Sequence, residues 1–322
     1  MKHILVRDVT EALGEGVWHL NICGVTENSR NGRVIVSPGP VLTEYRRPFN
    51  RVLQDPVRDA NPVFHLMEAL WMLAGQDNVE WLLQFNSKFG QYAEEDGTVH
   101  GAYGYRWFQH FAMDQVLAII QELQRDPQSR RAVLAMWDPR ADLGADKRDL
   151  PCNTHIYFDL RMGLLNMTVC CRSNDMVYGA YGANAVHMSI LQEVMASALN
   201  VSIGVYRQFS NNFHVYPDVP VAKALMTGWP GIYDSSPYVW GAVQTMRLIA
   251  ENETMDEFLE DCHTLVHGLS NPINTTFFQT VAVPLRDLYI KRQPGQIISI
   301  PPGMEHNDWW VAFLQWTIRR AK

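Results

Sequence analysis

Cys152 is the strongest candidate for a nucleophile in this chain because of the residues around it. It follows Pro151 and precedes the polar pair Asn153-Thr154, at the start of a predicted strand rather than inside an apolar stretch. A lone buried cysteine is more often a small core residue than a catalytic one. An arginine on a neighbouring strand, such as Arg172, would favour the thiolate, which is the nucleophilic form. This pair predicts a covalent catalytic site.

Arginines in three parts of the chain are candidate phosphate ligands. Arg172 opens the polar run Arg172-Ser173-Asn174-Asp175, and Ser173 adds a hydroxyl donor beside it. Arg30 lies near the N-terminus, and the pair Arg130-Arg131 follows the turn signal Asp126-Pro127. A guanidinium group binds phosphate through a bidentate fork. Adjacent arginines are more often solvated surface, so the interpretation depends on the rest of the site.

Composition limits the class of protein. The chain has 322 residues, 47% of them apolar and 19% charged, which is enough for one large core or a core with a subdomain. The net charge of -7 argues against a protein that coats nucleic acid. The five cysteines form no CxxC pair and the N-terminus lacks an apolar signal-peptide core, which fits the cytoplasm, or a host cytoplasm for a viral protein. No apolar run approaches the roughly 20 residues of a membrane span, so we expect no membrane association.

The pattern of apolar residues predicts a mixed α+β protein without repeats or linkers. Alternation over strand lengths occurs in 17–25 and 156–169, and a further strand is expected over 132–137. Apolar residues at every third and fourth position predict helices over 62–85, 115–124, 184–199, 254–265 and 308–320. Glu68 lies inside the strongly apolar part of the first helix. It is either at the edge of a cavity or on an exposed helix face.

At these residues the chain resembles the thymidylate synthase family, which includes the pyrimidine nucleotide hydroxymethylases. The resemblance covers roughly residues 15–216. It implies a thymidylate synthase-like α+β fold, with a mixed β-sheet and packed helices. Residues 1–216 would form the catalytic region, and residues 217–322 a mainly helical C-terminal extension packed on the same domain. It also implies a pyrimidine nucleoside monophosphate as substrate, 5,10-methylenetetrahydrofolate as cofactor, and no metal or nucleic acid.

The resemblance assigns catalytic roles to single residues. Cys152 corresponds to the cysteine that attacks C6 of the pyrimidine. Glu68 and Tyr103 correspond to the pair that organises water for proton transfer at C4 and C5. Asp175 corresponds to the aspartate near the base and the folate.

The resemblance also assigns the binding residues. Arg30, Arg172 and Ser173 match phosphate ligands, and Arg130 and Arg131 match the arginine pair that each subunit lends to its partner. The protein is therefore expected to be a homodimer. The residues that match the base and sugar contacts are Asn184 for the base and His214 and Tyr216 for the 3′-hydroxyl.

Four departures from the family pattern bear on the reaction. Asn153 follows the nucleophile where the methylating enzymes carry His, and GAYGANA has one extra residue before Asn184. Phe89 and Tyr92 stand where two Trp residues usually line the folate site. The terminus WTIRRAK lacks the short apolar end with a final Val that closes over the methylating site.

These departures favour a looser, wetter pocket, whereas a closed dry pocket protects a reactive intermediate from hydrolysis. We therefore expect a pyrimidine deoxynucleotide 5-hydroxymethylase, in which water captures the methylene intermediate. The alternatives are a thymidylate synthase and, more remotely, a catalytically silent nucleotide-binding relative. Asn184 can read uracil or, with its amide flipped, cytosine, so dUMP is favoured and dCMP stays open.

Overall fold

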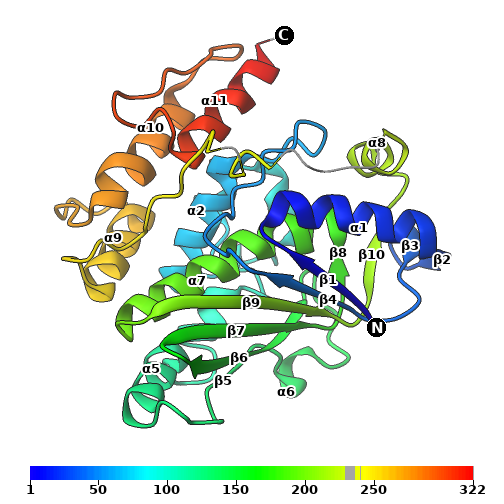
Figure 1. The fold of residues 1–322 in the computed structure, drawn as a ribbon, viewed down its shortest axis with the longest axis horizontal. Helices are drawn as coiled ribbons and strands as arrows, with labels where there is room; N and C mark the ends of the chain where they lie inside the picture. The colour runs from blue at the N-terminus through cyan, green and yellow to red at the C-terminus, as the bar shows by residue number, and fades with distance from the viewer. Residues whose placement is uncertain (229–235, 240, 322) are drawn as a thin grey trace.

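The computed structural model describes residues 1–228, 236–239 and 241–321. Helices and β-strands are both abundant in it, as expected for an α+β protein (Figure 1). The α-helices are α1 (Val9–Cys23), α2 (Pro62–Leu73), α3 (Glu80–Leu83), α4 (Tyr103–Phe108), α5 (Gln115–Arg125), α6 (Pro139–Asp142), α7 (Asn184–Ala198), α8 (Pro220–Gly228), α9 (Met255–His267), α10 (Val283–Lys291) and α11 (Asp308–Arg320). Other helical segments are the 3₁₀ turn η1 (Ser87–Tyr92) and the π-helices η2 (Met176–Ala183) and η3 (Phe278–Ala282).

The strands of the described residues form two mixed sheets. The strands are β1 (Lys2–Val6), β2 (Val25–Ser29), β3 (Gly32–Val36), β4 (Val41–Tyr45), β5 (Val133–Ala135), β6 (Asn153–Arg161), β7 (Leu164–Cys171), β8 (Asn174–Asp175), β9 (Ser202–Ser210) and β10 (Phe213–Val215). The larger sheet has the order β1-β4-β9-β7-β6-β5, and the smaller one β2-β3-β10-β8. Parallel pairs, β1 with β4, β7 with β9 and β8 with β10, occur beside antiparallel ones. The mixed sheet expected from the sequence is confirmed.

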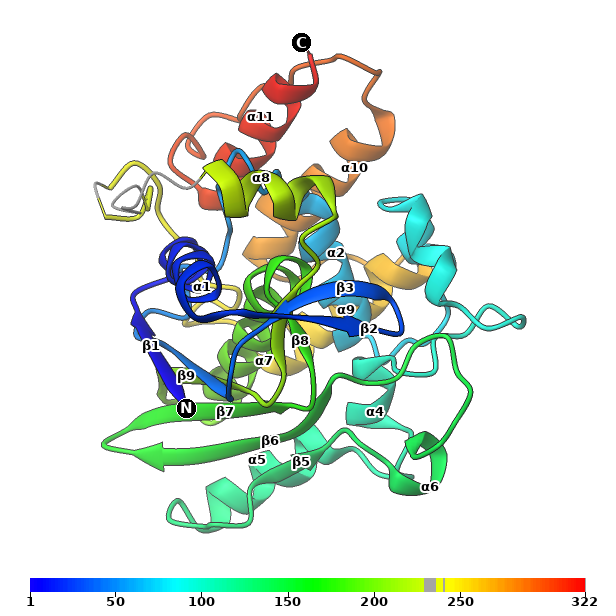
Figure 2. The ribbon, with the colours of Figure 1, turned by 90° about the vertical axis from the view of Figure 1, so that its right-hand side faces the viewer.

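Figure 1 shows the long helices α1, α2 and α7 on the same side of the larger sheet, with α9, α10 and α11 beyond them. In the view turned by 90°, the β2–β3 hairpin crosses in front of α7 (Figure 2). The core lies between α2, α7 and the sheet, and Leu70, Trp71 and Met195 are almost fully buried there. This packing sets α2 and α7 side by side, although they are far apart in the sequence.

The strand expected over 17–25 is wrong, because most of that segment belongs to α1. Asp8 caps this helix by accepting hydrogen bonds from the backbone N–H groups of Thr10 and Glu11. The buried residues of α1, such as Leu13, Val17 and Leu20, follow a helical period that begins before residue 17. The alternation after Val17 was too short to show that period.

The helix expected over 62–85 is shorter than predicted. Pro62 occupies the first turn and the Asn61 side chain caps it, but α2 ends at Leu73. The chain then turns at Gly75, whose φ of 68° is in the left-handed region that favours glycine. The apolar residues after the turn belong to the separate short helix α3.

Other predicted elements agree more closely with the structure. α5, α7 and α11 match the segments 115–124, 184–199 and 308–320 within one residue at each end. The predicted strand 156–169 is a hairpin of β6 and β7, turning at Met162-Gly163, where both φ angles are positive. The helix expected from 254 runs over Met255–His267, with a capping box between Thr254 and Glu257.

The C-terminal helices pack against helices from earlier in the chain. α9 and α11 both contact α2. Buried polar contacts add to this packing: the backbone N–H of Val52 donates to the Tyr238 hydroxyl at 3.2 Å, and that of Leu248 donates to Glu193 Oε1 at 2.8 Å. The boundary at residue 216 stays a prediction. In the part of the chain that the structure describes, the helices are too short or too polar to cross a bilayer.

Candidate active site

Cys152 lies immediately before β6, beside the end of β7. The backbone N–H of Arg172 donates to the Cys152 carbonyl at 2.9 Å, which fixes the two residues next to each other. The Arg172 guanidinium donates to the carbonyls of Leu150 and Pro151, and its Nη2 atom is 4.0 Å from Cys152 Sγ. Burial raises the pKa of the Cys152 thiol, and the charge of Arg172 opposes that rise. The charge of Arg172 therefore favours the thiolate form of Cys152.

A cavity of about 290 Å³ opens in front of Cys152. Its walls come from α2, η1, α4, η2 and α7, elements widely separated in the sequence. The predicted site residues that line it are Glu68, Phe89, Tyr92, Tyr103, Cys152, Asp175 and Asn184. One chain thus assembles the predicted catalytic groups around the thiol.

Tyr103 lies next to the nucleophile. Its hydroxyl accepts a hydrogen bond from the backbone N–H of Asn153 at 3.4 Å. Burial raises the pKa of Tyr103 well above its usual value, and the neighbouring Cys152 thiol adds to the rise. The phenol therefore stays protonated and can donate a proton or a hydrogen bond into the cavity.

Glu68 has a partner that sequence reasoning missed, His187 on α7. His187 Nε2 is 3.3 Å from Glu68 Oε2, and both side chains are almost fully buried. The two atoms are not aligned as a hydrogen bond, and no other hydrogen-bond partner for them occurs among the described residues. A signal was present, since His187 follows Asn184 by three residues and so lies on the same helix face. The cavity therefore carries an imidazole beside its most buried carboxyl group.

Asn153 does not face the cavity, although it occupies the family's histidine position. Its Oδ1 atom accepts from the Cys171 thiol at 2.7 Å, and the side chain is fully buried. The imidazole that faces the cavity comes from His187 instead. His187 thus adds to the cavity an imidazole that the resemblance did not assign, beside Glu68 and Tyr103.

The extra residue before Asn184 is accommodated by the π-helix η2. The backbone N–H of Asn184 bonds to the carbonyl of Gly179, five residues earlier, where an α-helix would bond four residues back. Asp175 caps the start of η2 by accepting from the N–H groups of Val177 and Tyr178. The wider turn absorbs the insertion and returns Asn184 to the cavity wall.

The Asn184 amide is held by a polar network below the cavity. Its Nδ2 atom donates to Asn174 Oδ1 at 3.2 Å, and Asn174 in turn donates to Ser210 Oγ at 3.1 Å. This arrangement leaves Asn184 Oδ1 as an acceptor and one N–H as a donor. Both groups are then available to a base.

Phe89 and Tyr92 form an aromatic wall. Their ring centres are 5.4 Å apart with a T-shaped geometry. Tyr92 keeps 41% of its surface exposed. Tyr178, which also lines the cavity, keeps 46% of its surface exposed. Exposed flat rings of this kind fit a planar heteroaromatic group, such as a pterin.

His214 and Tyr216 extend from the same region along β10. His214 pairs with Asp175 in the parallel β8–β10 register and bonds to Asn212 Oδ1 at 2.8 Å. Burial lowers the pKa of His214, while the Asp175 carboxylate opposes that change. The rings of His214 and Tyr216 meet edge to face at 5.2 Å. Ser173 is half-buried between Arg172 and β8.

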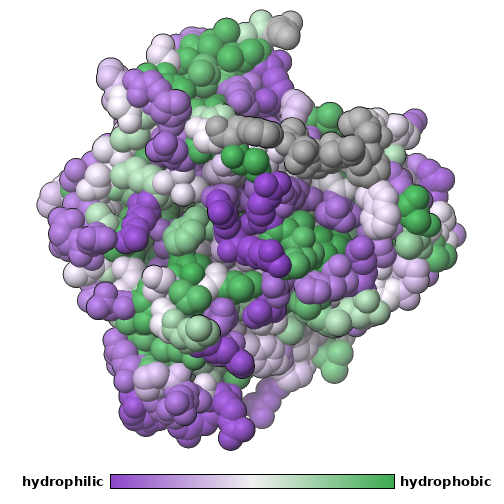
Figure 3. All heavy atoms as spheres, viewed as in Figure 1, coloured by the Kyte–Doolittle hydropathy of each residue, from purple (hydrophilic) through white to green (hydrophobic). Residues whose placement is uncertain are grey.

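None of the predicted phosphate arginines lines this cavity, although Arg172 lies beside Cys152. Arg30 is exposed at the tip of the β2–β3 hairpin. Arg130 and Arg131 are exposed after α5, and Arg131 pairs with Glu122 at 2.7 Å. Figure 3 shows a hydrophilic area at the lower edge of the molecule, where α5 and the following turn lie.

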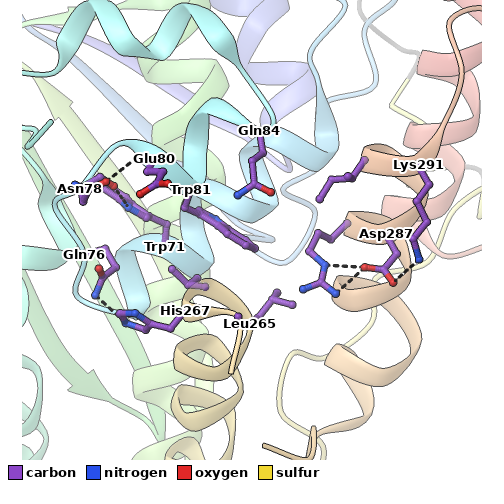
Figure 4. Close-up of a pocket in the computed structure, with 14 residues that line it drawn as sticks. Trp71, Gln76, Asn78, Glu80, Trp81, Gln84, Leu265, His267, Asp287 and Lys291 are labelled. Atoms are coloured by element: carbon purple, nitrogen blue, oxygen red, sulfur yellow. Dashed lines mark hydrogen bonds and ion pairs between the residues drawn. The ribbon is translucent and has the colours of Figure 1, made fainter. Parts of the chain in front are cut away.

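A second, larger cavity of about 580 Å³ lies between the α2–α3 region and the α9–α10 helices (Figure 4). Several of its polar groups are paired with each other: Asp287 bonds to Arg286 and to Lys291, and Gln76 bonds to His267. None of the predicted site residues line it. We therefore assign the chemistry to the smaller cavity in front of Cys152. Among the described residues, no three His, Cys, Asp or Glu side chains are grouped so that they could hold a metal ion.

A cavity with a thiol beside a positive charge, buried ionisable groups and an aromatic wall is suited to an enzyme that acts covalently on a small planar substrate. Residues 58–231 match the family model described as thymidylate synthase, which is more than half of the chain. The chain therefore belongs to the thymidylate synthase family. It is a folate-dependent one-carbon transferase with a nucleotide substrate.

Relatives with curated names include two branches of this family. The deoxyuridylate hydroxymethyltransferase of Pseudomonas phage M6 is 40% identical over 99% of this chain and 95% of its own length. The enzyme of the same name from Bacillus phage SP01 is 35% identical over 60% of this chain and 53% of its own length. A putative thymidylate synthase of Methanothermobacter marburgensis is 32% identical over 56% of this chain and 85% of its own length.

Proposed function

We propose that this protein is a deoxyuridylate 5-hydroxymethylase, which uses 5,10-methylenetetrahydrofolate and water to place a hydroxymethyl group on C5 of dUMP. The observation that carries the proposal is the match to the phage M6 deoxyuridylate hydroxymethyltransferase over nearly the whole of both chains. The cavity supports the same chemistry, since it holds a thiol, protonatable groups and an aromatic wall together.

Cys152 is the proposed nucleophile. Its thiolate would add to C6 of the pyrimidine, which makes C5 nucleophilic towards the one-carbon unit. Arg172 would bind the nucleotide phosphate together with Ser173, while its charge stabilises the thiolate. The position of Arg172, with its guanidinium 4.0 Å from Sγ, supports both tasks.

Glu68, His187 and Tyr103 are the proposed proton-transfer groups. Negative charge develops on the C4 oxygen when C6 is attacked, and a protonated group nearby stabilises it. His187 would hold the Glu68 carboxyl in place from the α7 side, since their nearest atoms are 3.3 Å apart. Tyr103, which stays protonated, would donate a hydrogen bond on the side of Cys152.

Asn184 is the proposed reader of the base. With its Nδ2 atom already donating to Asn174, the amide can accept from uracil N3–H and donate its second hydrogen to O4. Cytosine would require the amide to flip and give up the bond to Asn174. This network favours dUMP over dCMP.

Phe89, Tyr92 and Asp175 are the proposed contacts of the folate, which supplies the carbon at the oxidation level of formaldehyde. The wall they form is open to solvent at Tyr92, which is 41% exposed. An open wall admits water to a reactive intermediate that a dry site would protect. Water capture gives the hydroxymethyl group, whereas hydride transfer would give a methyl group.

The phosphate end is proposed to need a second copy of the chain. One face of the larger sheet is buried under helices, along the row Thr43, Gln208, Val169 and Ile156. The opposite row, Leu42, Phe209, Cys170 and His155, is only half-buried. A partly apolar sheet face of this kind is typical of a subunit interface.

Arg130 and Arg131 lie where they could reach across such an interface. They enter β5, the edge strand of the same sheet, where Val133 is opposite Tyr157 on the half-exposed face. Both arginines would then contact the phosphate held by the partner's Arg172, while His214 and Tyr216 would bind the 3′-hydroxyl of the sugar. Arg30, at the hairpin tip, would close over the phosphate from the same chain.

The test is product analysis with dUMP, dCMP and methylenetetrahydrofolate in water labelled with ¹⁸O. We expect a hydroxymethyl nucleotide from dUMP that contains the label, with release of tetrahydrofolate. An unlabelled methyl nucleotide with stoichiometric dihydrofolate would establish a thymidylate synthase instead. Tight dUMP binding without turnover would indicate a silent relative.

A further inference from the structure

Asp149 lines the cavity, but it takes no part in the reaction steps proposed for Cys152, Glu68, His187 and Tyr103. It lies three residues before Cys152, and its carboxylate is near enough to Cys152 and Tyr103 to influence the ionisation of both. Among the described residues, its side chain has no hydrogen-bond partner, in contrast to those of Asp142 and Asp175. The carboxylate is half-buried and faces the same open space as the thiol.

Gly101 gives the Asp149 carboxylate its position. A Cβ atom built on Gly101 would lie 2.3 Å from Asp149 Oδ2, which is closer than real atoms approach, and a tight 3.1 Å from its Cγ. The carboxylate therefore rests directly against the bare backbone of Gly101, which is itself part of the cavity lining. Only glycine at this position leaves room for this arrangement.

The other two carboxylates of the cavity have different surroundings. Glu68 lies beside the His187 imidazole, without an aligned hydrogen bond. Asp175 accepts two backbone N–H bonds at the start of η2. Burial raises the pKa of Asp149, which makes it a better proton acceptor than an ordinary surface aspartate, while the charges of Arg106 and Arg172 keep it ionisable.

We propose that Asp149 is the general base that activates the water in the capture step, an inference that rests on the proposed hydroxymethylase function. The Asp149 carboxylate takes a proton from the water as its oxygen bonds to the exocyclic methylene carbon at C5. The electron pair of that C=C bond moves to the C4 oxygen and gives an enolate. The enolate then collapses, the C5=C6 bond re-forms, and the Cys152 thiolate leaves C6. No oxidant or reductant is needed.

The experiment separates water capture from the earlier steps. With dUMP carrying tritium at C5, tritium release reports the attack by Cys152, one-carbon transfer and loss of the C5 proton. Mass analysis reports the hydroxymethyl product. Added 2-mercaptoethanol competes with water for the methylene carbon and gives a thioether, which needs less base assistance because a thiol ionises more readily than water.

Asp149→Asn should keep tritium release within a few-fold of the wild-type rate. The ratio of hydroxymethyl product to thioether should fall about 100-fold, the lower end of what a positioned base contributes. Gly101→Ala, which retains the carboxylate but displaces it, should lower the same ratio. Asp146→Asn is the matched control, since Asp146 is exposed on the same loop and outside the cavity lining.

Two results would overturn the role of Asp149. An unchanged product ratio in Asp149→Asn would show that water needs no help from this carboxylate. Equal losses of tritium release and of hydroxymethyl product, at an unchanged ratio to thioether, would place Asp149 in an earlier step or in folate binding. Failure of the proposed function gives a different result, because the wild-type enzyme itself would then form the methyl nucleotide.

Discussion

The reaction end and the phosphate end of this site are built in different ways. Around Cys152, buried elements of one chain bring together a thiol, an imidazole and carboxyl groups. The proposed phosphate ligands are dispersed: Arg172 is beside the thiol, while Arg130 and Arg131 are exposed at the far edge of the sheet. The difference shows that core packing can bring ionisable groups together within one chain, whereas the proposed phosphate site would rely on surface side chains and on a second subunit.

The largest expected effect comes from the reaction end. Cys152→Ser should reduce turnover by about 10⁴-fold or more, because no other group can form the bond to C6. Nucleotide binding, measured by calorimetry, should change little, since its contacts lie elsewhere. Cys23→Ser is the matched control, because Cys23 is an exposed free thiol at the end of α1. Substantial turnover by the Cys152 variant would mean that the nucleophile has been misassigned.

Arg130→Ala and Arg131→Ala test whether the phosphate end is shared between subunits. Each should weaken dUMP binding by about 10- to 100-fold, the effect of losing a charge-assisted hydrogen bond. Mixing either variant with Cys152→Ser should restore part of the activity, because one site of the mixed dimer then has an intact thiol and intact partner arginines. Arg247→Ala, at another exposed arginine that pairs with Glu251, should have no effect.

No recovery after subunit exchange has been verified would contradict the shared site. It would also remove the contrast between the two ends, because both would then be built within one chain.

Arg172 belongs to both ends, so its replacement sharpens the comparison. Arg172→Gln should raise the pKa of the Cys152 thiol, since the arginine charge opposes the rise caused by burial. The thiolate fraction at neutral pH then falls, and alkylation of Cys152 by iodoacetamide, followed by mass spectrometry, should slow several-fold. Asp149→Asn should shift the alkylation profile in the opposite direction. An unchanged profile in Arg172→Gln would show that this arginine serves the phosphate alone.

The smallest effect on turnover is expected for a buried carboxyl group that serves only the fold. Burial raises the pKa of Asp308 to about 7. The folded state therefore keeps a proton that the unfolded state releases between about pH 4 and 7. This contribution to stability is full below the unfolded-state pKa and is lost as the pH rises to 7, at up to about 1.4 kcal/mol per pH unit.

Asp308→Asn should remove this pH dependence. Relative to the wild type, the variant should gain stability between pH 5 and pH 7.5 in urea unfolding. Asp256→Asn, at an exposed position of α9, is the control and should show no such trend. If the difference in unfolding free energy between the variant and the wild type stays constant across this range, Asp308 is ionised throughout.

Local features of the sequence determined much of this protein. The order of Cys152, Arg172-Ser173, Asn184 and His214 was enough to indicate the family, and the helices over 115–124, 184–199 and 308–320 follow from apolar periodicity. These signals are readable because caps and periodicity act over a few residues. Residues 17–25 contain only the last part of α1, which is too short to show the helical period of its apolar residues. The same reasoning therefore predicted a strand there.

Only the tertiary structure decided which side chains share the cavity. His187 meets Glu68 because α7 packs beside α2, and Asp149 faces Cys152 because Gly101 leaves room for it. The sequence shows an extra residue before Asn184, but only the structure shows that the π-helix η2 accommodates it. These contacts join residues far apart in the chain, and they depend on how the packed elements cross, which no local pattern of residues encodes.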